Sequence, residues 1–397
     1  MKVLQINIFG NLSTGRIAVD LYHTLKAEGH EGVIAYARNT LEKGVPGIRI
    51  GSRWDVYYHG IMTRLTDRAG FYSKRATGKL IEEIKAYNPD IIHLHNIHGY
   101  YLNIEILFNY LKEAGKPVVW TLHDCWAFTG HCCHYSAAGC EKWKKGCFDC
   151  EQSRAYPASF TDRSEENYKW KKKVFPSLPG LHLVAVSEWL KAQVKQSFLC
   201  QLPCRVIYNG IDTGRFRPLH SDFRKRYGLE KDFIILGVAS TWSRYKGLED
   251  FITLAGLLGE GYRVVLVGVS KEDKKRLPDR ILGLERTNSV EELAELYSAA
   301  DVFFNASREE TFGLPTAEAI ACHTPAIVYD ATALPEVITK ENGVVVPMGD
   351  LQAVKKVIEE IRREEKKFSF GEFAYDKKEK YQEYLKLYEE IMEGVKE

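Results

Sequence analysis

Short apolar segments alternate with amphipathic helical segments along nearly the whole chain, and the series begins again after the midpoint. Early in the chain, residues 3–8 and 118–122 are largely apolar. Strands of a parallel sheet have this composition because helices cover both of their faces. Ile17, Leu21 and Leu25 follow the first segment at the spacing of one helix face. The alternation predicts a doubly wound α/β domain.

The same alternation restarts in the second half. Its strand candidates are residues 233–238, 263–267, 302–305, 326–328 and 343–346. Between the two series lies Asn209-Gly210, a residue pair typical of turns. We therefore predict two Rossmann-like domains, 1–206 and 207–374. A charged amphipathic helix over 375–397 is expected to pack back on the first domain.

Charge and hydropathy narrow the class of partner. A formal net charge of +2 over 397 residues gives no electrostatic reason to expect nucleic acid. The apolar run after Lys2 is short and is interrupted by Gln5 and Asn7, unlike a secretory signal. No stretch approaches the roughly 18 apolar residues of a membrane-spanning helix. These features predict a cytoplasmic protein and leave open a peripheral contact at the inner face of the membrane.

The most informative motif is Glu-Thr-Phe-Gly-Leu-Pro-Thr-Ala-Glu at 310–318, directly after the strand candidate 302–305. Gly313 permits close backbone approach to a ligand, and Pro315 suits the first turn of a helix. The N-terminus of that helix would offer N–H groups and a positive dipole end to a diphosphate. The flanking carboxylates are suited to accept hydrogen bonds from hydroxyls.

This segment resembles the Glu-x7-Glu motif of family 4 retaining glycosyltransferases, which have the GT-B fold of two Rossmann-like domains facing a cleft. Further segments resemble the family: Tyr208-Asn209-Gly210-Ile211-Asp212, Lys246-Gly247, 319–325 and Leu334-Pro335-Glu336-Val337-Ile338. The resemblance covers most of the C-terminal half and, more loosely, the N-terminal half. It implies an acceptor-binding domain at 1–206 and a nucleotide-sugar-binding domain at 207–374.

The resemblance also implies roles for single residues. Glu310 would bind hydroxyls of the transferred sugar, and Glu318 would bind the ribose. Lys246 would neutralise the diphosphate, which the backbone N–H groups around Phe312, Gly313 and Leu314 would hold. No divalent metal would be required for the chemistry.

Three positions depart from the family pattern. The family usually carries an arginine five positions before the lysine, and this chain has Thr241 there. Arg244 is the natural substitute. His323 stands where a glycine is usual, and Thr332-Ala333 replaces a common glycine pair. These departures bear on loop details and on the identity of the donor.

The N-terminal half supplies its own candidates. Gly15 lies in a glycine-containing loop after the first strand, and by resemblance this loop approaches the donor phosphates and the acceptor. His123 ends the strand candidate 118–122, in a segment that resembles one whose histidine faces the donor sugar. There it would contact a hydroxyl and stabilise developing charge. The alternative for His123, as for His95 and His98, is a structural histidine.

Six of the nine cysteines lie between Cys125 and Cys150. Cys147 and Cys150 have the Cys-x2-Cys spacing of a zinc knuckle, and Cys132 and Cys140 would complete a tetrahedral thiolate site. A closed site of four such ligands would be structural and would secure an insertion at about 125–150. Three alternatives stay open: a reduced cysteine-rich loop, a disulfide, or ligation through His131, Cys133 or His134.

These observations predict a retaining glycosyltransferase that moves a sugar from a nucleoside diphosphate sugar to an acceptor hydroxyl. A front-face mechanism is favoured, in which the leaving phosphate assists deprotonation of the acceptor. The acceptor is expected to be a glycan or lipid-linked oligosaccharide in polysaccharide assembly. Two alternatives are a non-catalytic scaffold with a degenerate cleft and a GT-B sugar-nucleotide epimerase. An acceptor or membrane surface is expected among Tyr57, Tyr58, Arg64, Arg68, Phe71, Tyr72, Lys74, Arg75, Tyr100 and Tyr101.

Overall fold

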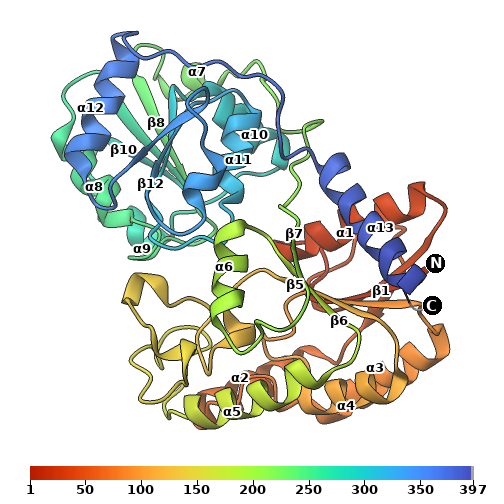
Figure 1. Ribbon diagram of the computed structural model, residues 1–397. Coiled ribbons are helices and arrows are strands. Elements are labelled where there is room, and N and C mark those ends of the chain that lie inside the picture. The colour runs from red at the N-terminus through yellow and green to blue at the C-terminus, as the bar shows by residue number, and fades with distance from the viewer. Residues whose placement is uncertain (395–397) are drawn as a thin grey trace. The chain divides into compact units, whose positions relative to one another are not determined.

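The computed structural model describes residues 1–394 and divides into two compact units (Figure 1). The first unit comprises Met1–Tyr208 together with the chain from Lys378 onward, and the second comprises Asn209–Lys377. Within residues 1–394, no helix has the length and apolar character needed to span a bilayer.

A parallel sheet of seven strands forms the centre of the first unit, in the order β3-β2-β1-β4-β5-β6-β7. The order reverses between β1 and β4, so a crevice is expected at their carboxyl ends. Seven strands have these bounds: β1 Lys2–Phe9, β2 Glu31–Arg38, β3 Gly47–Arg49, β4 Ile91–Leu94, β5 Val118–Leu122, β6 Leu181–Ala185 and β7 Cys204–Val206.

Helices connect these strands and cover the sheet (Figure 1). They are α1 Thr14–Ala27, α2 Arg53–Thr66, α3 Lys74–Tyr87, α4 Ile104–Ala114, α5 Ser164–Val174 and α6 Glu188–Gln196. The segment between β5 and α5 holds three single-turn 3-10 helices, η1 Trp126–Phe128, η2 Ser136–Ala138 and η3 Lys142–Lys144, and a fourth, η4 Phe175–Ser177, follows α5.

The last helix, α13 (Lys377–Gly394), packs against the sheet of the first unit. Tyr384, Leu385 and Tyr388 share a core with Val3 of β1 and Val119 of β5. Two buried hydroxyls join this helix to the sheet, since the Tyr388 hydroxyl lies 2.6 Å from His93 Nδ1 and the Tyr384 hydroxyl lies 3.1 Å from Thr121 Oγ1. The C-terminal segment therefore completes the core of the N-terminal sheet.

A second parallel sheet, of six strands, forms the other unit in the order β10-β9-β8-β11-β12-β13. Its strands are β8 Phe233–Val238, β9 Tyr262–Val267, β10 Ile281–Leu284, β11 Val302–Asn305, β12 Ala326–Tyr329 and β13 Gly343–Val346. Its helices are α7 Phe223–Tyr227, α8 Leu248–Leu257, α9 Lys271–Lys274, α10 Val290–Ala299, α11 Leu314–Ala321 and α12 Leu351–Arg362, with η5 at Leu334–Val337. The order reverses between β8 and β11, which places the expected crevice beside α11.

Removing the Tyr388 hydroxyl should destabilise the protein. Tyr388→Phe leaves a nitrogen of the fully buried His93 without this partner, which costs about 1–3 kcal/mol. Tyr168→Phe is the matched control, because the buried Tyr168 hydroxyl makes no hydrogen bond within residues 1–394. Chemical denaturation of both variants checks this, and equal losses in the two would contradict the assigned role of Tyr388.

Candidate functional site

The loop between β11 and α11 is held in a defined shape by its own polar groups. The Asn305 side chain accepts a hydrogen bond from the Ser307 N–H at 3.0 Å and donates one to Thr316 Oγ1 at 2.9 Å. Gly313 begins the helix with a φ of +95°, and a Cβ there would lie 2.8 Å from Leu334. The backbone conformation and the close packing both require glycine.

The N-terminus of α11 has the features of an anion site. Within residues 1–394 no side chain caps it, and Pro315 occupies its first turn. The N–H groups at this end therefore point toward a ligand position with the positive end of the helix dipole. Phe312 is buried and packs edge-on against Tyr375, with ring centroids 5.3 Å apart. Its predicted contribution is accordingly limited to its backbone.

Lys246 and Glu310 meet beside this helix end. The Lys246 ammonium lies 2.5 Å from Glu310 Oε1, and the two side chains are 34% and 17% exposed. Gly247 allows the approach, because a Cβ there would lie 2.5 Å from the Ala306 carbonyl oxygen. Thr332 fixes the backbone of Glu310 by accepting its N–H at 2.8 Å and donating to its carbonyl at 2.7 Å. A partly exposed lysine and a carboxylate are thus brought together from two loops.

The other predicted donor residues have different environments. Glu318 is only 4% exposed, and its Oε2 accepts a hydrogen bond from the Tyr297 hydroxyl at 3.0 Å. Arg244 is exposed, with its guanidinium 5.6 Å from the ring of Tyr245. Leu314 opens α11 directly after Gly313. The structure therefore brings Glu310 and Lys246 into contact and places Glu318 on the buried side of α11.

Sequence reasoning missed Arg308, which braces the same loop. Its guanidinium makes two contacts with the Asp250 carboxylate of α8, at 2.9 and 3.2 Å. The Tyr329 hydroxyl of β12 donates to the same carboxylate at 2.9 Å. These bonds tie the segment before Glu310 to two neighbouring elements. The sequence signal that could have revealed this ion pair is Asp250, a carboxylate in the first turn of α8 only four residues after Lys246.

In the first unit, Gly15 lies at the switch point between β1 and α1. A Cβ at this position would lie 2.7 Å from the Phe9 carbonyl oxygen, so only glycine lets α1 start this close to β1. Thr14 anchors the turn by donating to Asn7 Oδ1 at 3.0 Å. The turn therefore presents backbone at the carboxyl end of β1.

His123 belongs to a line of hydrogen-bonded side chains. Its Nε2 lies 3.0 Å from His95 Nδ1, and His95 Nε2 lies 3.0 Å from Gln5 Oε1. Because the amide oxygen of Gln5 only accepts, His95 Nε2 donates and His95 Nδ1 accepts. His123 Nε2 then donates, and its Nδ1 acts as an acceptor. Burial lowers the pKa of His123 to about 4, so the ring is neutral at neutral pH.

His98, Asp124 and Cys133 gather beside His123, with their potential ligand atoms all within 4.8 Å of one another. His98 Nε2 lies 2.7 Å from Asp124 Oδ2, and the Trp126 N–H donates to Asp124 Oδ1 at 2.9 Å. Burial opposes ionisation of Asp124, yet the charge and hydrogen bond of His98 outweigh it and lower the pKa of Asp124 to about 2. These partners hold the residue after His123 in place.

Four cysteines of this unit are poor nucleophiles. Burial raises the pKa of Cys147 to about 11 and that of Cys150 to about 12. Burial likewise raises the pKa values of Cys132 and Cys133 well above the usual range. A thiol protonated at neutral pH reacts slowly, so these side chains do not form a thiolate catalyst.

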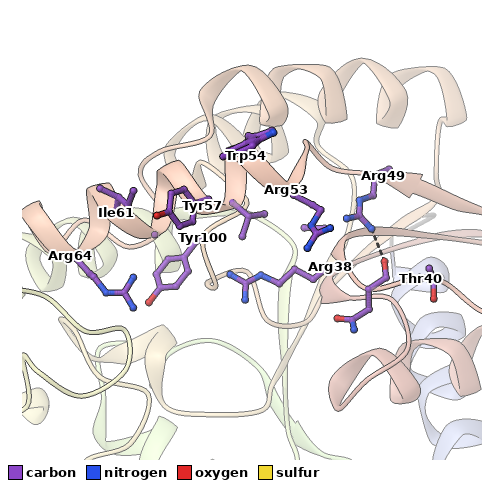
Figure 2. A pocket seen from close by; sticks show the side chains of 13 residues that line it. Arg38, Thr40, Arg49, Arg53, Trp54, Tyr57, Ile61, Arg64 and Tyr100 are labelled. Atoms are coloured by element: carbon purple, nitrogen blue, oxygen red, sulfur yellow. Dashed lines mark hydrogen bonds between the residues drawn. The ribbon is translucent and has the colours of Figure 1, made fainter.

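A pocket of about 1060 Å³ opens over α2 and the end of β2 (Figure 2). Four arginines line it, Arg38, Arg49, Arg53 and Arg64, and its lining within the described chain includes no acidic side chain. Trp54 and Tyr57 of α2 and Tyr100 add aromatic surface, and Trp54 is 79% exposed. Such a pocket favours an acidic ligand that also carries rings or apolar groups.

The residues predicted for an acceptor surface lie in different environments. Tyr57, Arg64 and Tyr100 line the pocket, whereas Tyr101 and Phe71 are buried. The Arg68 guanidinium lies 3.5 Å from the ring of Phe71. Sequence reasoning missed Arg38, Arg49 and Arg53, which reach the pocket from β2, β3 and the start of α2.

Comparison with known proteins identifies the chain. Residues 14–215 match the family model described as Glycosyltransferase Family 4, and residues 220–377 match Glycosyl transferases group 1. The chain belongs to glycosyltransferase family 4. The segment with Glu310 and Lys246 and the segment with Gly15 and His123 lie within these matches. The chain is therefore an enzyme that transfers glycosyl groups.

Curated relatives of this glycosyltransferase include bacterial polysaccharide enzymes. A protein of Escherichia coli K12, named as a colanic acid biosynthesis glycosyl transferase, is 26% identical over 76% of this chain and 77% of its own length. The O-antigen chain mannosyltransferase of Salmonella typhimurium LT2 is 28% identical over 40% of this chain and 44% of its own length.

Solved structures confirm the GT-B fold. The sucrose-phosphate synthase of Thermosynechococcus elongatus has a TM-score of 0.68 at 19% identity and covers 100% of this chain and 97% of its own. The Anabaena protein HepE, in complex with UDP and glucose, has a TM-score of 0.69 at 16% identity and covers 98% of this chain and 100% of its own.

Acid should destabilise this glycosyltransferase through its buried histidines. Burial lowers the pKa of His59 and of His93 to about 3 and that of His95 well below the usual range. The unfolded chain takes up protons near pH 6.5 that these folded histidines take up only at much lower pH. The stability they contribute is therefore present above about pH 6.5 and is lost as the pH falls toward the folded-state pKa of about 3.

We expect the free energy of unfolding to fall between pH 7.5 and 5.5 by roughly 1 kcal/mol for each of these histidines. Chemical denaturation at the two pH values measures it. His23→Gln should leave the fall unchanged, because His23 is half exposed. A free energy of unfolding that stays constant over this range would contradict the assignment of neutral buried rings.

Proposed function

We propose that the protein is a retaining glycosyltransferase that moves a sugar from a nucleoside diphosphate sugar to a hydroxyl of an acidic acceptor in polysaccharide assembly. The observation that carries the proposal is the Lys246–Glu310 pair at the N-terminus of α11, which no side chain caps within residues 1–394. This is a site for an anion and, next to it, for hydroxyl groups. The names of the two curated relatives support the polysaccharide context.

In the proposed reaction the acceptor hydroxyl oxygen bonds to the anomeric carbon as the bond from that carbon to the phosphate oxygen breaks. The bonding electrons pass to the diphosphate, and the acceptor proton passes to a phosphate oxygen on the same face. The N–H groups around Phe312, Gly313 and Leu314 and the Lys246 ammonium stabilise the charge that develops there. The mechanism requires no divalent metal.

The Lys246–Glu310 contact gives the site a way to respond to the donor. A bound diphosphate competes with Glu310 for the Lys246 ammonium. Once the ammonium turns to phosphate, the Glu310 carboxylate accepts hydrogen bonds from the sugar hydroxyls instead. Glu318, bonded to Tyr297, is assigned to the ribose, and Arg244 is assigned as a second cation on the Lys246 loop.

The N-terminal unit contributes the remaining assigned groups. Gly15 lets the turn after β1 run close to the donor phosphates, and His123 is assigned to a donor-sugar hydroxyl. A neutral His123 cannot neutralise a phosphate, so its assigned role is positioning. UDP-glucose and UDP in the HepE structures support a nucleotide sugar as the donor class.

The arginine pocket of the first unit is assigned to the acceptor. Four guanidinium groups without a facing carboxylate in the pocket lining suit a phosphate, a diphosphate or an acidic sugar. Trp54 and Tyr57 offer ring faces for stacking against sugars. On the same helix Tyr58 and Leu65 are more than half exposed, which fits a peripheral contact with the inner face of a membrane that carries a lipid-linked acceptor.

Donor binding should be measurable as thermal stabilisation by a panel of UDP-, GDP-, dTDP- and ADP-sugars. At 100 times the dissociation constant, a donor adds about 2.7 kcal/mol to the stability of the folded state. Lys246→Ala and Glu310→Gln should each lower the affinity for the selected donor by about 10-fold or more, because each removes a charge-assisted hydrogen bond. Lys274→Ala, at an exposed position of α9, is the control.

Analysis of the product tests whether the enzyme transfers a sugar with retention of configuration. Nuclear magnetic resonance of the product should show the anomeric configuration of the donor. Donor binding without any transfer to acidic glycan acceptors would favour a binding scaffold, and inversion of the configuration would refute the mechanism. A panel in which no donor stabilises the wild-type protein would count against the assigned donor site.

Removing arginines from the pocket should weaken acceptor binding and leave donor binding unchanged. Arg53→Ala and Arg64→Ala should raise the acceptor KM by about 10-fold each and leave the thermal shift with donor unchanged, since each removes one charge-assisted contact. Lys79→Ala is the control, because Lys79 is exposed and lies outside the pocket lining. Steady-state kinetics with varied acceptor decide this, and an unchanged acceptor KM would remove the pocket from the site.

A further inference from the structure

The segment between β5 and α5 runs for about 40 residues with little regular structure. It contains only three single-turn 3-10 helices, yet much of it is buried, with Trp143 at 1% and Cys132 at 6% exposure. Long segments without secondary structure are uncommon in compact domains unless something else orders them. The fold therefore needs a local source of order here, apart from the donor and acceptor sites.

Four cysteines of this segment converge on one small cavity. Cys132, Cys140, Cys147 and Cys150 line a space of about 30 Å³, which Trp143 and Phe148 help to close. All four are thiols and form no disulfide with one another. The volume is enough for a water or an ion and too small for an organic ligand. Four cysteines that line one ion-sized space supply the ligand set of a closed zinc site.

Backbone N–H groups point at the sulfurs of the Cys-x2-Cys pair. The Gly130 N–H donates to Cys147 Sγ at 3.1 Å, and the Gln152 N–H donates to Cys150 Sγ. A side chain at position 130 would place its Cβ 2.7 Å from Cys147 Cβ, so glycine is needed for this approach. Such bonds stabilise a thiolate, the form that binds a metal.

A buried cation lies beneath the same cluster. Lys171 of α5 is 1% exposed, and its ammonium donates to the carbonyls of Trp126 and Thr129 at 2.7 and 3.0 Å. Its electrostatic partners are Cys133 first and then Cys147 and Cys132, two of the four cavity cysteines. Zinc with four thiolates carries a net charge of −2, which a buried ammonium partly offsets. Without an anionic partner such as a zinc–thiolate centre, burying the Lys171 ammonium would be costly.

The neighbouring candidate ligands are less suited than the four cysteines, although His131 also lines the cavity. His131 Nδ1 lies 2.5 Å from Asp67 Oδ1, and the His134 side chain is exposed. Cys133 belongs to the group with His98 and Asp124. Within residues 1–394, no three of the four cavity sulfurs all lie within 4.8 Å of one another. Sulfurs that bind one zinc ion lie closer together, so these side chains must move inward when an ion binds. Zn–S bonds of about 2.3 Å set the final spacing.

We propose that Cys132, Cys140, Cys147 and Cys150 bind one structural zinc ion. On binding, Zn²⁺ replaces the four thiol protons, which pass to solvent, and no oxidation is involved. The ion joins residues 132 and 140 to the Cys147–Cys150 pair within the irregular segment, and so secures Gly130 and the carbonyls that Lys171 contacts. The site orders the chain that leads from Asp124 to α5, and it takes no part in transfer.

Zinc content measured by elemental mass spectrometry tests the site. Full-length protein purified under reducing conditions with zinc in the medium should hold about one zinc per chain. Cys147→Ser and Cys150→Ser should lower this at least about five-fold. Cys133→Ser and Cys200→Ser, in the neighbouring group and at an exposed position, should leave it unchanged.

A second measurement serves if the serine variants do not fold. Wild-type protein stripped with a chelator and given Co²⁺ should show intense sulfur-to-cobalt charge-transfer absorption, and Zn²⁺ should abolish it. Wild-type protein without zinc, with the four cysteines either alkylated as thiols or paired in disulfides, would overturn the proposal. Zinc lost in Cys133→Ser but kept in Cys147→Ser would also overturn it, because the ion would then lie at His98 and Asp124.

Discussion

Both sheets are parallel throughout, and a parallel sheet must be covered on both faces because neither face can be left to solvent. In the first unit the chain meets this requirement partly with α13, whose tyrosines pack on the sheet from nearly 300 residues away in sequence. The same parallel geometry gathers the strand ends of each sheet at one edge. The loops with Gly15 and His123 in one unit, and with Lys246 and Glu310 in the other, lie at such edges.

Glycines let the backbone pass close to neighbouring segments at the edge of each sheet where the strands end. Gly15, Gly247 and Gly313 stand where a Cβ would collide with a neighbouring segment, and each lies at the start of a helix. At α11 the result is a helix end with Lys246 and Glu310 beside it. This loop is braced by the Arg308–Asp250 ion pair and by Thr332, which bonds to the backbone of Glu310. The loop is therefore ordered before any ligand binds.

Several buried histidines of the first unit lie in hydrogen-bonded networks. The line from Gln5 through His95 to His123 fixes the tautomer of each ring, and His93 is bonded to Tyr388 and Thr121. The cysteine segment adds a second polar region around Lys171. Both regions converge on the chain around Asp124, so the segment after β5 depends on groups that lie far apart in the sequence.

The sequence by itself determined the two doubly wound units, because the apolar alternation is local. The cysteine cluster and Gly313 were singled out from local pattern, and Glu310 and Lys246 were proposed through the family resemblance. The bounds of the expected strands differed little from those observed, as with β9 at Tyr262–Val267 in place of 263–267. Only the tertiary structure decided the burial of Glu318 against Tyr297, the Arg308–Asp250 brace and the arginine pocket. These depend on contacts between elements distant in sequence, and no local pattern encodes such contacts.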